Sequence, residues 1–171
     1  MDRTEILECL DRSDIEYEIA EHEAAGAIEE IDGFGLPTSG CIAKNLFLRD
    51  DKKRDYCLLV VPKDKTVDLK ELRTALGTRP LSFASEDDLL RLLGLHKGAV
   101  TPFGVMNDES RSVQVVIGGD VRSYPSVGVH PNENTATVWL SPDDLMRAIG
   151  EHGNPVRIAD VPGRRSSASS Q

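Results

Sequence analysis

Apolar and polar residues alternate along this chain with two periods, one typical of helices and one typical of strands. Residues 4–13 repeat apolar positions at helical spacing, and residues 14–20 then alternate with a period of two. This order predicts a short amphipathic helix that leads into a half-buried strand. A second short helix is predicted over residues 24–31, where it would end at Asp32 and Gly33.

Two apolar runs follow, joined by a charged turn at residues 50–55. Residues 42–48 and 56–61 both have the composition of strands, and the second run is apolar almost throughout. A near-continuous apolar strand is typical of the interior of a sheet. The pattern therefore predicts a β-hairpin with a buried second strand.

Three later helices carry recognisable start and stop signals. Residues 68–76 are followed by Gly77, a common helix terminator. Residues 85–93 begin with a Ser-x-x-Asp capping pattern, and Ser141 with Pro142 suits the first turn of a last helix. Further strands are expected at residues 81–84, 113–117, 135–140 and 156–158. The pattern predicts an α/β protein, a single domain with a mixed β-sheet and packed helices.

The chain has 171 residues, of which 39% are hydrophobic and 29% charged, as in globular proteins. We expect one domain over residues 1–161, because no linker interrupts it, and a disordered serine-rich tail over residues 162–171. No apolar run is long enough to span a membrane, and residues 1–20 lack the order of a signal peptide. We therefore expect a cytoplasmic protein with no membrane partner.

The formal net charge is −9, which disfavours broad contact with a nucleic-acid backbone. The charge is unevenly distributed. Between Lys44 and Arg79 there are ten Lys and Arg residues against six Asp and Glu, a local excess of four positive charges. Such a cluster could contact one or two phosphates, although clusters of this size are commonly solvated surface.

The three cysteines, Cys9, Cys41 and Cys57, are widely spaced and form no C-x-x-C pair. Neither a disulfide framework nor a zinc site is supported, and we expect no metal and no cofactor. Cys41 stands three residues before Lys44, and a nearby cation can lower a thiol pKa. A nucleophilic cysteine is therefore an open alternative.

A glycine-punctuated stretch over residues 33–40 runs directly into the strand that contains Lys44 and Asn45. Glycines let main-chain N–H groups approach a ligand closely. A lysine is costly to bury without a partner, so its place at the start of a strand suggests a small anionic ligand. A surface loop with a solvated lysine is the simpler reading.

Two further glycine-containing loops stand out. Residues 98–108 are unusually apolar for a loop, which indicates packing or the wall of a pocket. In the second loop, residues 127–135, His130 stands between glycine and proline just before a strand. It is either a ligand contact, gate or proton carrier, or an ordinary turn histidine. Hydrolase-elbow, Walker, zinc-protease and dinucleotide motifs are absent from the sequence.

Four strings occur in order along the chain: Lys44-Asn45-Leu46-Phe47-Leu48-Arg49-Asp50, Leu81-Ser82-Phe83-Ala84-Ser85, Val100-Thr101-Pro102-Phe103-Gly104, and Gly128-Val129-His130-Pro131-Asn132-x-Asn134-Thr135-Ala136-Thr137. Together they resemble the YbaK/prolyl-tRNA-synthetase-associated editing domains, and within them the free-standing alanyl-tRNA(Pro) deacylases. The resemblance covers residues 4–160. It implies the mixed-sheet fold of that family and the hydrolysis of mischarged tRNA(Pro), most of all alanyl-tRNA(Pro).

The resemblance also implies a set of site residues. Lys44, Gly35 and Asn45 would be catalytic: Lys44 would pair with the terminal phosphate, and N–H groups around Gly35 would hold the ester carbonyl. Substrate-binding residues would be Gly33, Phe34, Leu36, Pro37, Gly104, Gly128 and His130. The partner would be the acceptor end of tRNA(Pro), and prolyl-tRNA synthetase or an elongation factor are the protein partners it suggests.

One segment departs from the family pattern. Related proteins tend to carry a proline and bulky residues after His22, whereas this chain has Glu23-Ala24-Ala25-Gly26-Ala27-Ile28. If this segment lines the amino-acid pocket, the smaller residues could enlarge it, so editing of serine or cysteine is an alternative. A non-catalytic module that binds an aminoacyl end, a nucleotide or a synthetase is the alternative from another class.

Overall fold

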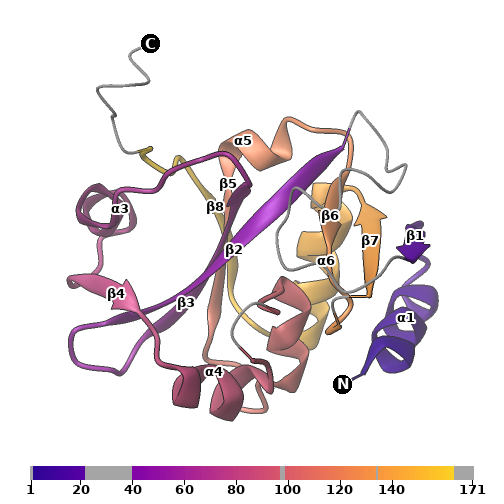
Figure 1. Ribbon diagram of the computed structural model, residues 1–171, viewed down its shortest axis with the longest axis horizontal. Coiled ribbons are helices and arrows are strands. Elements are labelled where there is room, and N and C mark those ends of the chain that lie inside the picture. The colour runs from indigo at the N-terminus through magenta and orange to yellow at the C-terminus, as the bar shows by residue number, and fades with distance from the viewer. Residues whose placement is uncertain (1, 22–39, 97–98, 134, 164–171) are drawn as a thin grey trace.

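The computed structural model describes residues 2–21, 40–96, 99–133 and 135–163. Eight strands form one sheet in the order β1-β7-β6-β2-β3-β5-β8, and β4 pairs with β2 beside this path (Figure 1). The strands are β1 (Glu18–Glu21), β2 (Cys41–Asp50), β3 (Tyr56–Pro62), β4 (Leu81–Phe83), β5 (Gln114–Gly118), β6 (Val127–Val129), β7 (Ala136–Leu140) and β8 (Val156–Ala159). The helices are α1 (Arg3–Arg12), α3 (Leu69–Leu76), α4 (Glu86–Leu93), α5 (Gly119–Arg122), α6 (Pro142–His152) and the 3₁₀ helix η2 (Pro102–Asn107).

The sheet is mixed, which confirms the predicted fold class. β2 is antiparallel to β3 and β4 but parallel to β6, and β3, β5 and β8 are parallel to one another. The predicted hairpin is the β2–β3 pair. β3 alternates between two cores, with Leu58 and Val60 facing one and Leu59 and Val61 facing the other. Burial on both faces is the reason for its continuous apolar sequence.

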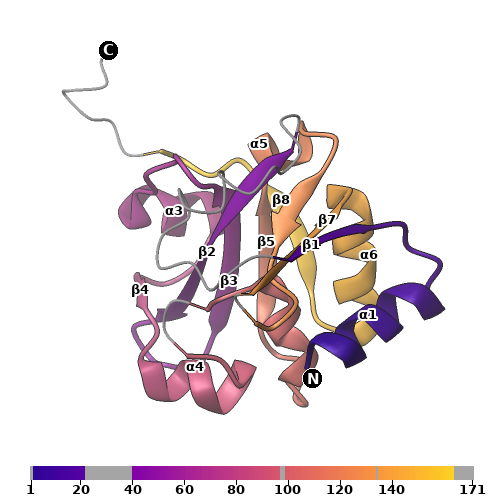
Figure 2. The same ribbon diagram turned by 45° about the vertical axis from the view of Figure 1, so that its right-hand side comes forward.

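The helices lie on both faces of the sheet (Figure 2). The larger core is formed against α1, α4, α6 and η2, whereas α3 covers the smaller core on the opposite face. The caps and the terminating glycine predicted from the sequence are confirmed. Ser85 and Asp88 form the predicted capping box on α4 and Ser141 caps α6, whereas Asp68, predicted as the first residue of its helix, is the cap of α3. Gly77 ends α3 in a left-handed conformation.

Four predictions need correction or cannot be placed. The strand predicted over residues 14–20 is shorter and begins at Glu18. Val127–Val129, predicted as part of a loop, is β6, because it is paired on both sides by β2 and β7 despite its central glycine. The apolar loop at residues 98–108 contains η2, whose residues Pro102 to Met106 are buried. The helix predicted over residues 24–31 lies outside the described residues.

The C-terminal end of the described chain packs against the start of α3. Gly163 forms a bridge with Val67, and the main-chain N–H of Asp68 donates to the carbonyl of Pro162. The rest of the tail predicted to be disordered, residues 164–171, lies outside the described residues. Within the described part of the chain, none of the helices has the length and apolar character needed to span a membrane.

Candidate active site

Strand alternation places three of the predicted site residues on one face of the sheet. β2 and β6 are parallel, with Ile42 beside Gly128, and side chains two residues apart on a strand share a face. Lys44 therefore lies on the same face as Gly128 and, one step beyond the end of β6, His130. Trp139 of β7 shares this face because it pairs with Gly128. We call the face that carries Lys44, Gly128, His130 and Trp139 the lysine face.

Lys44 is half-buried, and its Nζ donates a hydrogen bond to the main-chain carbonyl of Lys65. Lys65 is itself held by an ion pair, because its Nζ lies 2.8 Å from Oδ2 of Asp120. Burial lowers the pKa of Lys44, and the nearby Asp64 carboxylate partly opposes this shift. An ammonium group has three N–H donors. Among the described residues the Lys65 carbonyl accepts from one of them, so Lys44 is held in position with two donors left for an anionic ligand.

His130 is fixed on both its main chain and its ring. Its Nδ1 lies 2.9 Å from the carbonyl oxygen of Ala136, and its own carbonyl accepts a 2.6 Å hydrogen bond from Oγ1 of the fully buried Thr101. Because a carbonyl can only accept, Nδ1 carries the proton and Nε2 is the basic nitrogen of the neutral ring. The ring orientation is therefore set by the fold before a ligand binds.

Asn45 follows Lys44 in sequence but faces the opposite side of β2, toward the larger core. Its Nδ2 donates a 3.2 Å hydrogen bond to the carbonyl of Val100. Its Oδ1 is buried and has no hydrogen-bond partner in the described part of the chain. Asn45 thus joins β2 to the segment that leads into Thr101 and His130, and it contributes to the site from behind the strand.

A groove of about 480 Å³ opens along the edge of β2 next to Asn45. On this edge β2 pairs with β6 only at Cys41 and Ile42 and with β4 only from Leu48 to Asp50, so the sheet leaves a gap between them. The groove is lined by Asn45, Leu46, Phe47, Phe83, Ala84, Ser85, Glu86, Leu89 and Val100. This gap lies beside the part of β2 where Lys44 points to one face of the sheet and Asn45 to the other.

Gly104 and Gly128, both predicted to bind substrate, are glycines for which packing alone gives a reason. A Cβ atom on Gly128 would come within 2.9 Å of the Trp139 ring, and one on Gly104 within 2.6 Å of Leu95. A Cβ on Gly40 would meet the same ring at 2.3 Å. Two residues that sequence reasoning missed therefore shape the candidate site. The Trp139 ring packs against Gly128, and the Thr101 hydroxyl holds the carbonyl of His130. The available signals were that Trp139 is the only tryptophan in the sequence and that Thr101 stands in one of the four strings.

Replacing Gly128 by Ala is expected to lower the free energy of unfolding by about 2 kcal/mol, because the added methyl group must displace a rigid indole ring. It should also shift the emission of Trp139. Urea unfolding followed by Trp139 fluorescence measures both. Gly150→Ala is the control, since a Cβ there meets nothing within 4 Å beyond its chain neighbours and the local backbone of α6, and helix propensity should make this variant slightly more stable. Unchanged stability and emission in Gly128→Ala would show that the ring does not restrict this position.

Five predicted site residues, Gly33, Phe34, Gly35, Leu36 and Pro37, lie outside the described residues. The described chain stops at the end of β1 and resumes at Gly40, just before β2. Both points lie beside the strands that carry Trp139 and Gly128. β1 pairs with β7, and Cys41 pairs with Val127 of β6.

The alternative of a nucleophilic Cys41 is disfavoured by its surroundings. Cys41 is buried in the larger core, on the face opposite Lys44. Burial raises the pKa of its thiol to about 11, and the carboxylates of Asp120 and Asp64 add to the shift. The thiolate is the nucleophilic form, so Cys41 is protonated and unreactive at neutral pH. Among the described residues, no group of three or more His, Cys, Asp or Glu side chains could hold a metal ion.

Comparison with known proteins identifies the class. The model of the aminoacyl-tRNA editing domain family matches residues 22–148, well over half of the chain. The chain therefore belongs to the aminoacyl-tRNA editing domain family. This confirms the family inferred from the four sequence strings and, with it, the prediction of an editing enzyme of the deacylase class.

Several individual relatives have names that refer to prolyl-tRNA or its synthetase. The prolyl-tRNA editing protein ProX of Acetoanaerobium sticklandii is 43% identical over 156 residues, which cover 91% of this chain and 95% of that protein. Prolyl-tRNA synthetase associated domain-containing protein 1 of Danio rerio is 36% identical over 151 residues, covering 87% and 82% of the two chains. The crystal structure of a candidate trans-editing enzyme for prolyl-tRNA synthetase superposes with a TM-score of 0.72 at 20% identity, covering 95% of this chain and 97% of that one. This last likeness confirms the fold.

Proposed function

We propose that this protein is a trans-editing hydrolase that removes alanine from mischarged alanyl-tRNA(Pro). The observation that carries the proposal is the lysine face, which holds a tethered ammonium group on β2 and an oriented imidazole just beyond the end of the neighbouring β6. The 43% identity to a prolyl-tRNA editing protein supports tRNA(Pro) as the nucleic acid. The net charge of −9 is compatible with this substrate because only the acceptor end needs to be bound.

The reaction is the hydrolysis of one ester bond. A water oxygen attacks the aminoacyl carbonyl carbon, the tetrahedral intermediate carries a negative oxygen, and the bond to the ribose oxygen then breaks. The ribose oxygen takes up a proton, so the products are the free amino acid and a tRNA with an intact terminal hydroxyl. In this proposal main-chain N–H groups around Gly35 donate to the carbonyl oxygen, and the substrate's own ribose hydroxyl helps to activate the water.

Lys44 acts in this scheme by binding the phosphate of the terminal nucleotide. Its two remaining N–H donors suit a phosphate oxygen, and the Lys65 carbonyl prevents the side chain from turning away. A fixed phosphate places the ester in a defined position relative to the attacking water, which lowers the entropic cost of the reaction. Asn45 and Val100 support β2 at this point from the opposite face.

His130 limits the size of the amino acid in this scheme. Its ring is held by the Ala136 carbonyl, and its main chain by Thr101. A wall that cannot move excludes a larger side chain through steric cost, and each methylene group is worth about 10- to 200-fold in discrimination. Alanine would therefore enter the pocket, whereas the proline ring would not.

The test is a panel of tRNA(Pro) species charged with alanine, proline, serine or cysteine. We expect alanine to be released at least about 100-fold faster than proline. Faster release of serine or cysteine than of alanine would assign the enzyme to another small amino acid. If all four esters survive at the rate seen in buffer, the hydrolase proposal is wrong and a non-catalytic module that binds the aminoacyl end takes its place.

A further inference from the structure

The turn that follows β3 determines where the Lys44 ammonium group is held. β2 and β3 are antiparallel, and Lys44 pairs with Val61 next to the end of β3. The chain then turns, and the main-chain N–H of Lys65 donates a 3.0 Å hydrogen bond to the carbonyl of Pro62. The turn brings the Lys65 carbonyl to Nζ of Lys44. The position of Lys44 therefore depends on how firmly the Lys65 peptide is held.

Asp120 reaches the same turn from another strand. β3 and β5 are parallel, so the segments that follow these strands leave the sheet at the same end. Asp120 is the second residue after β5, and its Oδ2 lies 2.8 Å from Nζ of Lys65. The Lys65 side chain is only 20% exposed in this pair. Asp120 thus restrains, through the side chain, the residue whose carbonyl holds Lys44.

The carboxylate of Asp120 is itself confined. A Cβ atom on Gly118 would come within 2.8 Å of Oδ1 of Asp120 and within 3.3 Å of the carbonyl oxygen of Val60. The glycine therefore leaves the space in which the carboxylate lies. Oδ1 is buried there and has no hydrogen-bond partner among the described residues. A buried acceptor without a partner costs free energy, and exceptions of this kind are expected at functional sites.

We propose that Asp120 is a positioning residue for the editing reaction: its ion pair fixes the Lys65 peptide, and the Lys65 carbonyl then fixes the ammonium group of Lys44. This inference rests on the phosphate-binding role proposed for Lys44. A lysine side chain is a flexible stem, so a fixed acceptor beside its end selects one arrangement before the substrate arrives. The ion pair also keeps the Lys65 ammonium group at Asp120, so that Lys44 and not Lys65 binds the phosphate.

Variants of the full chain test this order of contacts by deacylation of alanyl-tRNA(Pro). Asp120→Asn removes the charge at nearly constant size, and Lys65→Met removes the ammonium group but keeps the main-chain carbonyl. We expect each to lower kcat/KM about tenfold, in kcat as well as in KM, because a displaced phosphate misplaces the ester. Lys65→Arg can form the same ion pair and should keep most of the activity. In a Lys44→Met background neither change should reduce activity further, because both act through Lys44.

The same variants separate positioning from direct binding. If Lys65 itself binds the phosphate, Asp120→Asn frees its ammonium group, and this variant would be at least as active as the wild type while Lys65→Met loses activity. That result would overturn the proposal. Full activity in both variants would overturn it too, as would a further tenfold loss in the Lys44→Met background.

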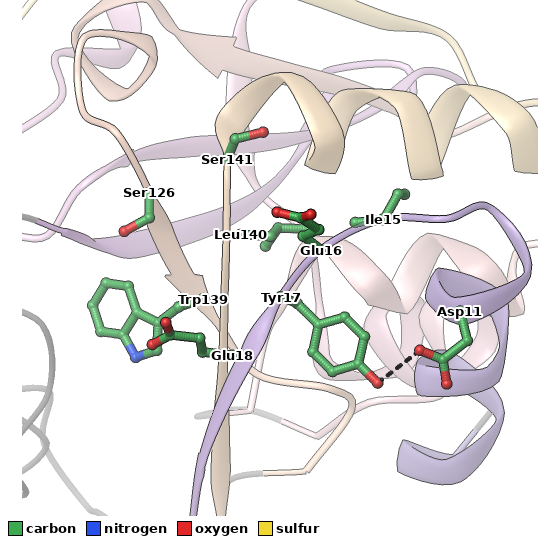
Figure 3. Close-up of a pocket in the computed structure, with 9 residues that line it drawn as sticks. All are labelled: Asp11, Ile15, Glu16, Tyr17, Glu18, Ser126, Trp139, Leu140 and Ser141. Atoms are coloured by element: carbon green, nitrogen blue, oxygen red, sulfur yellow. Dashed lines mark hydrogen bonds between the residues drawn. The ribbon is translucent and has the colours of Figure 1, made fainter.

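Asp11→Asn is the matched control for the loss of a hydrogen-bonded carboxylate. Asp11 accepts a 3.1 Å hydrogen bond from the Tyr17 hydroxyl in a pocket beside β7 (Figure 3). Neither Lys44 nor Lys65 lines that pocket, so deacylation should stay unchanged. The thermal midpoint of Asp120→Asn should stay within about 4 °C of the wild type, because a partly exposed ion pair contributes little to stability. A larger fall would assign Asp120 a structural role instead.

Labelling of lysines with an amine-reactive acetylating reagent tests the positioning without any tRNA. Release of Lys44 from the Lys65 carbonyl should speed acetylation of Lys44 about tenfold in Asp120→Asn and in Lys65→Met, the factor expected for one lost hydrogen bond. Peptide mass spectrometry measures it against Lys70, an exposed lysine of α3. Unchanged labelling of Lys44 would overturn the positioning role even if the wild type edits. Faster labelling in a protein that releases no amino acid would count against the proposed function alone.

Discussion

Replacing Lys44 by Ala lowers kcat/KM for alanyl-tRNA(Pro) about 100-fold, if the lysine face binds the terminal phosphate as proposed. A charged, half-buried donor that positions a substrate is worth about 3 kcal/mol in the transition state, which corresponds to this factor. The loss should fall on kcat as well as on KM, because an ester held loosely is misplaced relative to the attacking water. Single-turnover deacylation separates the two parameters.

Two further variants make this result specific. Lys44→Met keeps the apolar stem that is packed beside β3 but removes the charge, so it should be as inactive as Lys44→Ala. Lys70→Ala removes an exposed lysine of α3 and should leave deacylation unchanged. Full activity in Lys44→Met with a folded protein would contradict the assigned role of the ammonium group.

Replacing Asp88 by Ala is expected to lower the free energy of unfolding by about 3 kcal/mol, the largest effect on stability that we anticipate. The buried Asp88 carboxylate accepts hydrogen bonds from Arg49 at 2.6 Å, Arg91 at 2.9 Å and the Tyr56 hydroxyl at 3.1 Å. It also completes the capping box of α4 with Ser85. Its loss leaves the half-buried Arg49 without its partner and the helix without its cap.

Chemical unfolding of Asp88→Ala measures this change, and thermal unfolding should show a midpoint about 10 °C lower. The control is Asp87→Ala, which removes an exposed carboxylate of the same helical turn and should cost less than about 0.5 kcal/mol. If the two variants are equally stable, the network around Asp88 contributes nothing beyond a surface charge.

The effect of Asp88 should also depend on pH. Burial acts to raise the pKa of this carboxyl, but the hydrogen bonds from Arg91, Ser85 and Arg49 outweigh burial and hold the pKa well below its ordinary value. A carboxyl whose pKa is lower in the folded state stabilises the protein above its unfolded pKa, near 4, and loses this contribution as the pH falls further. The difference between wild type and Asp88→Ala should therefore shrink below about pH 4.

Helices α1, α3, α4 and α6 and the hairpin could be predicted because their signals are local, whereas α5 and η2 were not predicted. Capping by Asp68, Ser85 and Ser141 depends on hydrogen bonds within one turn, and Gly77 ends its helix through its own backbone conformation. β6 could not be predicted in this way. Its three residues become a strand only because β2 and β7 supply partners from distant parts of the sequence.

The sequence by itself determined the family, the mixed sheet and the identity of Lys44 and His130 as residues of interest. Tertiary structure alone decided how they are arranged. Neighbours on a strand point to opposite faces, so Lys44 and Asn45 are separated although they are adjacent in sequence. Gly128 joins Lys44 because β6 lies beside β2. The tautomer of His130 and the packing of Trp139 depend on contacts with distant segments, and such contacts leave no local pattern in a sequence.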